Sequence, residues 1–169
     1  MKKSLIAALL GCALAAPLFA QAENSYVSVG VGNSSYDAPN FDEGATGVGI
    51  AFGQSVTDVV GYEVGYVHFG SAKSDGFKLD TQSVYLAGVG TYPLSEAFSV
   101  YGKLGATINR YSEKSVFGSD SETRLRPLIG AGLGYKFTKE WSGAVEYVYF
   151  GELMDLKMSM WSANLRYHF

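Results

Sequence analysis

The residues best suited to chemistry are two glutamates, Glu63 and Glu146, each in the middle of a segment where apolar residues alternate with small or polar ones. Two facing carboxylates can act as general acid and general base in hydrolysis. Three basic residues, Lys103, Arg126 and Arg166, occupy the corresponding parity of other such segments. Because buried carboxylates need cationic partners, we expect the five charges to form structural salt bridges rather than a catalytic pair.

Two other groups of residues could carry chemistry. His68 and Ser71 could serve as base and nucleophile of a hydrolase, but His68 shares the parity of its apolar neighbours and lies at a strand end. We therefore interpret His68 as an interfacial residue. Asp37, Asp42 and Glu43 could bind Ca²⁺, and we interpret them instead as part of a solvated acidic loop. Two distant histidines predict no metal site, and we expect no cofactor.

The first 22 residues are predicted to be a secretory signal peptide, cleaved to leave 23–169 as a single domain. Two lysines precede an apolar run, 5–16, and a small-x-small cleavage motif follows. The single cysteine, Cys12, lies in this peptide, which excludes disulfides and thiolate chemistry from the mature chain. The mild acidic balance, without a basic cluster, argues against nucleic acid as a partner.

The elements that must position these residues are strands, and the last segment, 158–169, has the clearest pattern. One parity carries Trp161, Ala163, Leu165, Tyr167 and Phe169. The other parity carries Ser162, Asn164, Arg166 and His168. A period of two residues is typical of a strand with one apolar face and one polar face.

Seven earlier segments are predicted strands: 26–32, 46–53, 59–69, 82–92, 98–111, 124–137 and 142–150. For 82–92, both parities are fairly apolar and its faces cannot be assigned. Short turns (54–58, 93–96, 138–141) alternate strictly with long polar stretches (34–44, 70–81, 112–123, 151–157). This alternation predicts an all-β fold, an eight-stranded antiparallel up-and-down transmembrane β-barrel with both termini at the short-turn end.

The cost of placing charges in lipid predicts which face points inward. An arginine or lysine facing lipid at mid-depth costs about 2–4 kcal/mol, so the five charges should line the lumen beside glycines. The outward parity then carries aromatics suited to interfacial girdles: Tyr62, Tyr66, Tyr135, Phe137, Tyr147, Tyr149, Trp161, Tyr167 and Phe169. The alternative is a soluble lipocalin-like barrel with inverted faces, whose surface would be unusually poor in charge.

Several short motifs resemble the transmembrane domain of OmpA and related small opacity-type porins. They are 61–66 (GYEVGY), 92–94 (YPL), 101–105 (YGKLG), 126–127 (RP), 145–147 (VEY) and 167–169 (YHF). The resemblance implies an eight-stranded outer-membrane barrel with a salt-bridged lumen. It also implies a C-terminal signal for the outer-membrane assembly machinery, formed by Leu165, Tyr167 and Phe169. Gly134 and Ala144 replace charged residues common in the family, so we expect a thinner interior network.

We therefore expect a structural protein of the Gram-negative outer membrane, with periplasmic termini, displayed surface loops and at most a narrow pore. Expected partners are outer-membrane lipid and lipopolysaccharide, and the assembly machinery and periplasmic chaperones during biogenesis. An alternative is an adhesin or serum-resistance protein whose loops bind a host ligand. An outer-membrane lipid hydrolase would need an outward Ser/His/acid cluster at one membrane depth. Only His68 suggests such a cluster, so we expect no enzyme.

Overall fold

The computed structural model describes residues 24–169, apart from 39–40, 75–76, 116–117 and 154–155; for 36–43, 71–80, 111–123 and 153–156 it describes no side chains. The predicted signal peptide, 1–22, lies outside the described residues. Eight strands follow one another: β1 (Ser25–Ala38), β2 (Phe41–Ser55), β3 (Val60–Ser74), β4 (Phe77–Pro93), β5 (Phe98–Ser115), β6 (Gly118–Lys136), β7 (Trp141–Leu153) and β8 (Leu156–His168). Within the described residues, no helix is long and apolar enough to cross a membrane.

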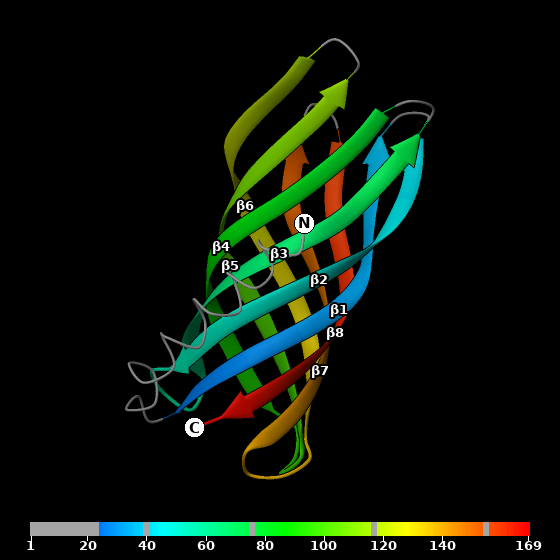
Figure 1. Ribbon diagram of the computed structural model, residues 1–169. Helices are drawn as coiled ribbons and strands as arrows, with labels where there is room; N and C mark the ends of the chain where they lie inside the picture. Colours follow the sequence, from blue (N-terminus) through cyan, green and yellow to red (C-terminus); the bar gives the residue numbers. More distant parts are fainter. Residues whose placement is uncertain (1–23, 39–40, 75–76, 116–117, 154–155) are drawn as a thin grey trace.

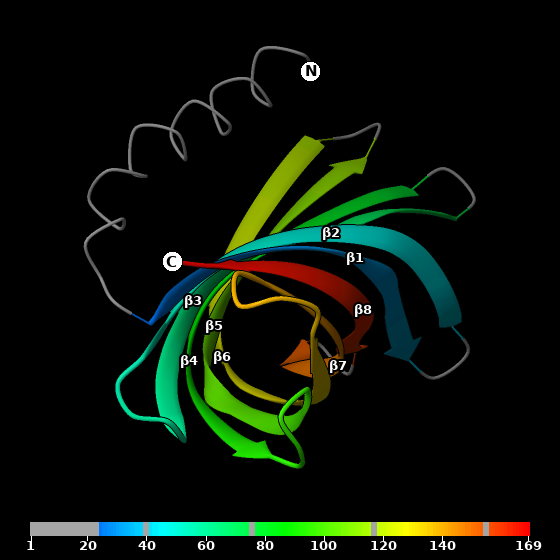
Figure 2. The same cartoon turned by 90° about the horizontal axis from the view of Figure 1, so that it is seen from below.

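The eight strands form a closed antiparallel barrel in sequence order (Figures 1 and 2). Closure joins β1 to β8, with Tyr26 opposite His168 and Asp37 opposite Lys157. The termini of this ladder lie at the short-turn end, where the amide of Phe169 donates to the carbonyl of Ser25. The predicted fold class is confirmed.

The alternation of side chains places the apolar parity on the outside of the barrel. Leu104 and Leu125 are 70% and 68% exposed, although both lie in the middle part of long strands. On the opposite parity, Glu63 and Lys103 are buried. An outside of exposed aliphatic side chains suits lipid and not water. The inverted faces of a soluble lipocalin-like barrel are therefore not found.

The long polar stretches predicted as loops are largely strand, and this part of the prediction was wrong. The β1–β2 ladder continues to Ala38 opposite Phe41, and the β5–β6 ladder continues to Ser115 opposite Gly118. Backbone pairing does not need an apolar face, so a hairpin can extend past the membrane with polar residues on both sides. The hydrophobic alternation therefore marked only the membrane-crossing part of each strand.

At the hairpin end the barrel divides into two sheets. The β2–β3 ladder ends at Val48 opposite His68, and the β6–β7 ladder ends at Ile129 opposite Tyr149. The other ladders continue, which leaves β7-β8-β1-β2 and β3-β4-β5-β6 as separate four-stranded extensions, with the β5–β6 hairpin the tallest (Figure 1). Pro127, just beyond Ile129, has no amide N–H for a ladder, which is typical of an edge position.

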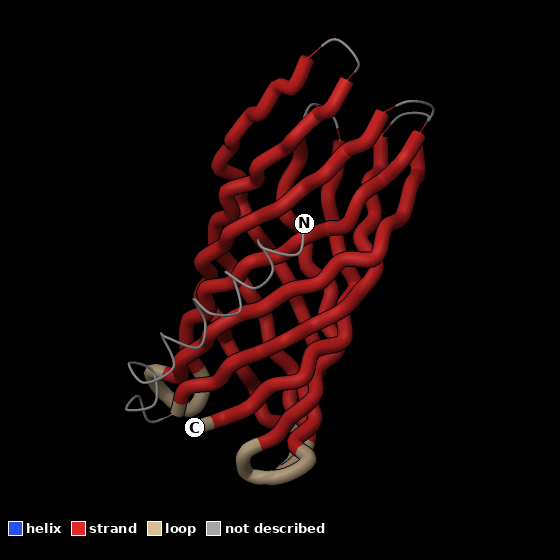
Figure 3. The backbone as a smooth tube through the Cα atoms, in the orientation of Figure 1, coloured by secondary structure: helices blue, strands red, loops and turns tan. Residues whose placement is uncertain are grey.

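The opposite end is trimmed by three turns with the same hydrogen-bond pattern, drawn in tan in Figure 3. In each turn, one side-chain hydroxyl accepts hydrogen bonds from two backbone amides, those of the residues two and three positions later in the chain. The three hydroxyls belong to Thr57, Ser95 and Thr138. These side chains satisfy amides that a tight turn leaves without ladder partners.

Candidate functional site

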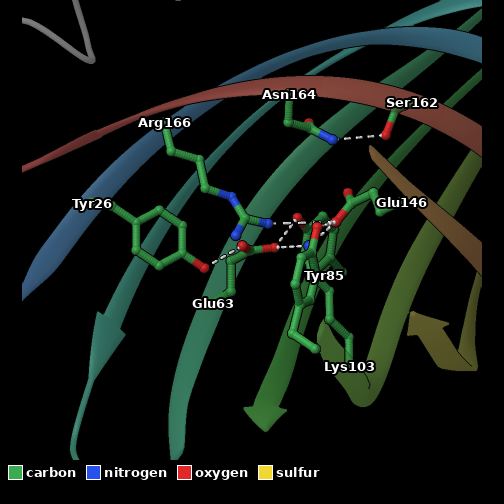
Figure 4. A network of polar contacts seen from close by, with 9 residues as sticks. Tyr26, Glu63, Tyr85, Lys103, Glu146, Ser162, Asn164 and Arg166 are labelled. Atoms are coloured by element: carbon green, nitrogen blue, oxygen red, sulfur yellow. Dashed lines mark hydrogen bonds and ion pairs between the residues drawn. The ribbon is translucent and has the colours of Figure 1, made fainter. Parts of the chain in front are cut away.

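The centre of the lumen is an ion-paired group that we name the charge cluster: Glu63, Lys103, Glu146 and Arg166 (Figure 4). The four residues come from β3, β5, β7 and β8. Lys103 Nζ lies 2.6 Å from Glu63 Oε1 and 2.7 Å from Glu146 Oε2, and all three side chains are buried. Lys103 thus bridges carboxylates from two strands that are not neighbours in the barrel wall.

Three tyrosines complete the coordination of the two carboxylates. The hydroxyls of Tyr26 and Tyr85 each donate to Glu63 at 2.6 Å, and the hydroxyl of Tyr101 donates to Glu146 at 2.8 Å. Charge-assisted bonds of this kind offset part of the cost of burying an ion. The sequence analysis did not assign these donors. Tyr26 and Tyr101 share the inward parity and could have been found from it, whereas Tyr85 lies in the segment whose faces were unassigned.

Arg166 extends the charge cluster toward the short-turn end. Its Nη2 lies 3.7 Å from Glu146 Oε2, and its guanidinium lies 4.5 Å from the ring centroid of Tyr101 and 5.1 Å from that of Tyr26. A guanidinium between aromatic faces gains cation–π attraction at desolvated positions. The cluster therefore holds two acids and two bases, which balance in formal charge.

The tyrosines fit because each lies over a glycine directly opposite on a neighbouring strand. The pairs are Tyr26 with Gly53, Tyr85 with Gly65 and Tyr101 with Gly132. A Cβ added at Gly65 or Gly132 would lie 2.5 Å from the tyrosine ring, and one at Gly53 would lie closer still. The inward glycines therefore make room for aromatic side chains that cross the lumen.

Toward the hairpins the lumen is filled by a second layer, the apolar plug, formed by Phe69, Leu128, Phe150 and Met158. These side chains are 0–2% exposed, and the rings of Phe69 and Phe150 pack edge to face with centroids 4.8 Å apart. The Asn109 side-chain amide donates to the carbonyl of Phe150 at 3.1 Å. The plug and the charge cluster block the lumen in series.

The described residues line two spaces in the lumen, a small cavity and a vestibule that is open at the short-turn end. A cavity of about 30 Å³ lies between the charge cluster and the plug, lined by Glu63, Lys103 and Phe150 among others, which is room for about two water molecules. A vestibule of about 250 Å³ opens at the short-turn end and is lined by Tyr26, Arg166 and His168 among others.

The structure brings four of the five predicted lumen charges together and leaves Arg126 apart. Arg126 lies on the hairpin side of Leu128, where a Cβ added at Gly151 would lie 2.6 Å from the Cβ of Arg126. Its Nε is buried without a hydrogen-bond partner among the described residues. Its distance from the cluster follows from its height on β6, two residues beyond the plug residue Leu128, and parity does not specify height.

The two histidines each contact a residue of a neighbouring strand. His68 Nδ1 lies 3.3 Å from the carbonyl oxygen of Thr81, and His168 Nε2 lies 2.7 Å from Ser142 Oγ. The side chains of Ser71, Asp37, Asp42 and Glu43 lie outside the described residues. Among the side chains that are described, none form a group of three or more metal-ligating residues.

The predicted C-terminal signal residues, Leu165, Tyr167 and Phe169, all lie on the outward face and are exposed. The Tyr167 ring lies 5.0 Å from that of Trp141 and 5.3 Å from that of Phe169, measured between centroids. This aromatic row sits at the short-turn rim, where a girdle meets the bilayer interface.

Comparison with solved structures supports the barrel. Neisserial surface protein A aligns with a TM-score of 0.76 and 15% identity, covering 87% of this chain and 98% of that one. Ail of Yersinia pestis, in complex with the heparin analogue sucrose octasulfate, aligns with a TM-score of 0.68 and 21% identity, covering 86% and 97%. The N-terminal β-barrel domain of Pseudomonas aeruginosa OprF gives 0.61 and 17%, covering 87% and 100%.

Comparison of sequences identifies the family. Outer membrane protein A of Yersinia pseudotuberculosis serotype I (strain IP32953) is 29% identical over 179 residues, covering 92% of this chain and 50% of that protein. The protein of the same name from Escherichia coli O157:H7 is 29% identical over 172 residues, covering 92% and 49%. The chain thus spans about half the length of these curated relatives. A family model described as "Outer membrane protein beta-barrel domain" matches residues 4–169. The chain belongs to this family of outer membrane β-barrels and is an integral protein of the outer membrane.

Proposed function

We propose that the protein is a structural barrel that anchors in the outer membrane and displays four paired hairpins on the cell surface. The observation that carries this proposal is the contrast between an exposed apolar outside and a lumen filled by the charge cluster and the plug. The short turns and both ends of the barrel face the periplasm, as trimmed turns do in bacterial outer-membrane barrels. The elaborated hairpins then lie outside the cell.

Two obstructions in series leave no open pore for solutes. Conductance of the purified full chain in planar bilayers tests this: we expect no resolved channel openings from the wild type. The double variant Phe69→Ala/Phe150→Ala removes the two aromatic rings of the plug but keeps the ion pairs of Lys103, so it should also stay closed. Adding Lys103→Met breaks the ion pairs that join Glu63 to Glu146 across the lumen and should produce channel steps. Steady conductance by the wild type would contradict the proposal.

Assembly depends on the outward C-terminal row of Leu165, Tyr167 and Phe169. Its exposed aromatics offer the assembly machinery and periplasmic chaperones an apolar strand end, and lipid and lipopolysaccharide then surround the folded barrel. Deletion of Phe169 tests this by heat-modifiability of the outer-membrane fraction on a gel. The unheated wild type should migrate as a compact species, and the truncation should lose that species. Truncated protein that still reaches the membrane and migrates compactly contradicts the role of this residue.

A second function is adhesion to a host ligand through the hairpins. Above the plug the strands form two separate sheets, and a ligand can bind between them. Ail, whose fold is similar, was solved in complex with a heparin analogue. Exposed Arg110 lies near the base of the β5–β6 hairpin, where it could meet a sulfated ligand. Replacement of residues 110–121, Arg110 included, by a Gly/Ser linker should abolish binding to immobilised heparin while the compact gel species persists. Unchanged binding after this replacement removes the adhesin hypothesis.

We assign no enzymatic activity to the protein. The Nδ1 atom of His68 contacts the carbonyl of Thr81 and the amide of Gly70, so this nitrogen is engaged with the backbone. A lipid hydrolase needs a histidine nitrogen directed at a serine hydroxyl and oriented by an acid. His168 Nε2 lies 2.7 Å from Ser142 Oγ, but no acid among the described side chains is hydrogen-bonded to the His168 ring. Release of fatty acid from phospholipid vesicles by the purified protein would contradict this assignment.

A further inference from the structure

The apolar band on the outside of the barrel is much shorter on one side than on the other. On β2 the outward positions between Gln54 and Thr46 hold only Phe52, Ile50 and Val48. On β6, and at Phe137 directly after its last residue, every outward position up to Leu125 is apolar or aromatic. These residues are Phe137, which follows the strand, and Tyr135, Leu133, Ala131, Ile129, Pro127 and Leu125 of β6.

The two heights follow from strand geometry. Eight residue steps separate Gln54 from Thr46, and twelve separate Phe137 from Leu125. With a rise of about 3.4 Å per residue and a tilt of about 40° from the barrel axis, these spans correspond to about 20 Å and about 30 Å along the axis. The β2 face therefore has polar boundaries about 10 Å closer together than the apolar span of β6.

Neighbouring strands continue the short band into a coherent face. Asn33 of β1 lies directly opposite Thr46 and is exposed on the same outward surface. On β3, the Tyr62 hydroxyl donates to Gln54 at the lower boundary, and the Tyr66 hydroxyl donates to the side chain of Gln82 at 2.9 Å near the upper boundary. Only Val64 lies between these two tyrosines on the outward parity of β3.

We propose that the outward face of β1, β2 and β3 is a membrane-thinning surface, which draws the two headgroup layers of the bilayer together beside it. A bilayer whose hydrocarbon thickness matches β6 would cover Gln54 and Thr46 with acyl chains. Tilting the barrel changes the level of each face but not its height, so it cannot match both sides at once. A bilayer adapts to a short apolar span on a protein by becoming thinner next to it.

The occupant of this face is phospholipid, with polar headgroups at the level of Asn33, Thr46 and Gln54. The boundary residues are uncharged amides and a hydroxyl, which exchange hydrogen bonds with headgroups and interfacial water. The apolar residues between them, such as Val29 and Val48, are about half exposed, and acyl chains can cover them. This inference depends on the outer wall and is independent of what the hairpins bind.

Depth measurement in bilayers tests the proposal. Single-cysteine variants of the full chain, made in a Cys12→Ser background, carry an environment-sensitive fluorophore in phosphatidylcholine vesicles brominated at known chain depths. Labels on the boundary variants Thr46→Cys and Gln54→Cys should be quenched most by bromines near the headgroup. A label on the mid-band variant Ile50→Cys should be quenched most by bromines near the chain ends.

Two results overturn the proposal. Blue-shifted Thr46→Cys and Gln54→Cys labels, quenched most by deep bromines, mean that the bilayer keeps its thickness across this face. Labels that escape both sets of bromines, and regain quenching when the protein is diluted in lipid, mean that a second copy of the chain covers the face. The label on Leu125→Cys, at the tall β6 side, calibrates the undeformed interface in every sample.

A compensated set of variants gives a second readout. The triple variant Asn33→Leu/Thr46→Leu/Gln54→Leu lengthens the short band and should shift the lipid chain length that gives the best refolding yield toward longer chains. The matched triple Asn33→Gln/Thr46→Ser/Gln54→Asn keeps polar boundaries and should leave the optimum unchanged. Identical optima for the wild type and the leucine variant overturn the proposal.

Discussion

Substitution of Lys103 by methionine tests whether the charge cluster holds the barrel together. The ammonium of Lys103 makes two short bonds, 2.6 Å to Glu63 and 2.7 Å to Glu146, and its side chain is about 3% exposed. A hydrogen bond to a charged group contributes about 1.5–3 kcal/mol, and breaking a buried ion pair costs about 3–5 kcal/mol. We therefore expect Lys103→Met to lower the free energy of unfolding by about 4 kcal/mol.

The loss of unfolding free energy in Lys103→Met depends on the two carboxylates that remain buried. A second substitution at one of them therefore distinguishes an electrostatic effect from a packing effect. Glu63 keeps its two tyrosine donors and Glu146 keeps Tyr101 and Arg166, but both lose their nearest cation. Adding Glu63→Gln removes the carboxylate that is left without an ion pair, while the amide oxygen of the glutamine can still accept a hydrogen bond from a tyrosine hydroxyl. The double variant Lys103→Met/Glu63→Gln should recover about half of the lost stability.

The assay is urea unfolding of the full chain in phospholipid vesicles, followed by the fluorescence of Trp141 and Trp161, with migration on unheated gels as a second probe. The outward neighbour Leu104 supplies the control, since Leu104→Met replaces one lipid-facing apolar side chain by another and should change stability by less than about 0.5 kcal/mol. A Lys103→Met variant within about 1 kcal/mol of the wild type would refute the reasoning. So would a double variant no more stable than Lys103→Met alone.

Two further substitutions test the packing of the barrel. Gly65→Val places a side chain against the ring of Tyr85, where a Cβ would lie 2.5 Å away, and overpacking should lower the free energy of unfolding by about 1–3 kcal/mol. Gly90→Val is its control, because a Cβ there meets nothing within 4 Å; equal losses in urea titration would contradict the prediction. Thr138→Ala removes the hydroxyl that accepts hydrogen bonds from the amides of Glu140 and Trp141 at 3.2 and 3.1 Å. It should lower the free energy of unfolding by about 1 kcal/mol in the same titration. An unchanged free energy of unfolding would show that the turn is stable without this hydroxyl.

Alternation in the sequence was enough to predict the eight strands, their order and which parity faces the lumen. The placement of Glu63 and Lys103 on the inside follows from parity and the cost of charge in lipid. The same reasoning overlooked Tyr85, since the segment 82–92 is apolar on both parities and carries no charge to orient it. Its inward direction is set by the ladder with β3, where Tyr85 pairs with Gly65.

Two other features depend on quantities that a single strand does not carry. The separation of Arg126 from the charge cluster depends on the stagger between strands, which fixes the height of each residue above the short-turn end. The hairpin extensions depend on pairing between two polar segments, such as Ser112 with Ser121, and polar alternation looks the same in a loop and in a solvated ladder. The register of the closed barrel supplies both.

The three tyrosine–glycine pairs of the lumen have a consequence for how this protein can diverge. At such a pair, a side chain added to the glycine meets the ring, and removal of the ring leaves an unfilled space and a carboxylate with one donor fewer. Substitution of the glycine alone or of the tyrosine alone therefore destabilises the barrel, whereas substitution of both can restore the packing. Gly53 and Tyr26, Gly65 and Tyr85, and Gly132 and Tyr101 should vary together among homologous sequences, while lipid-facing positions such as Leu104 drift independently of their neighbours.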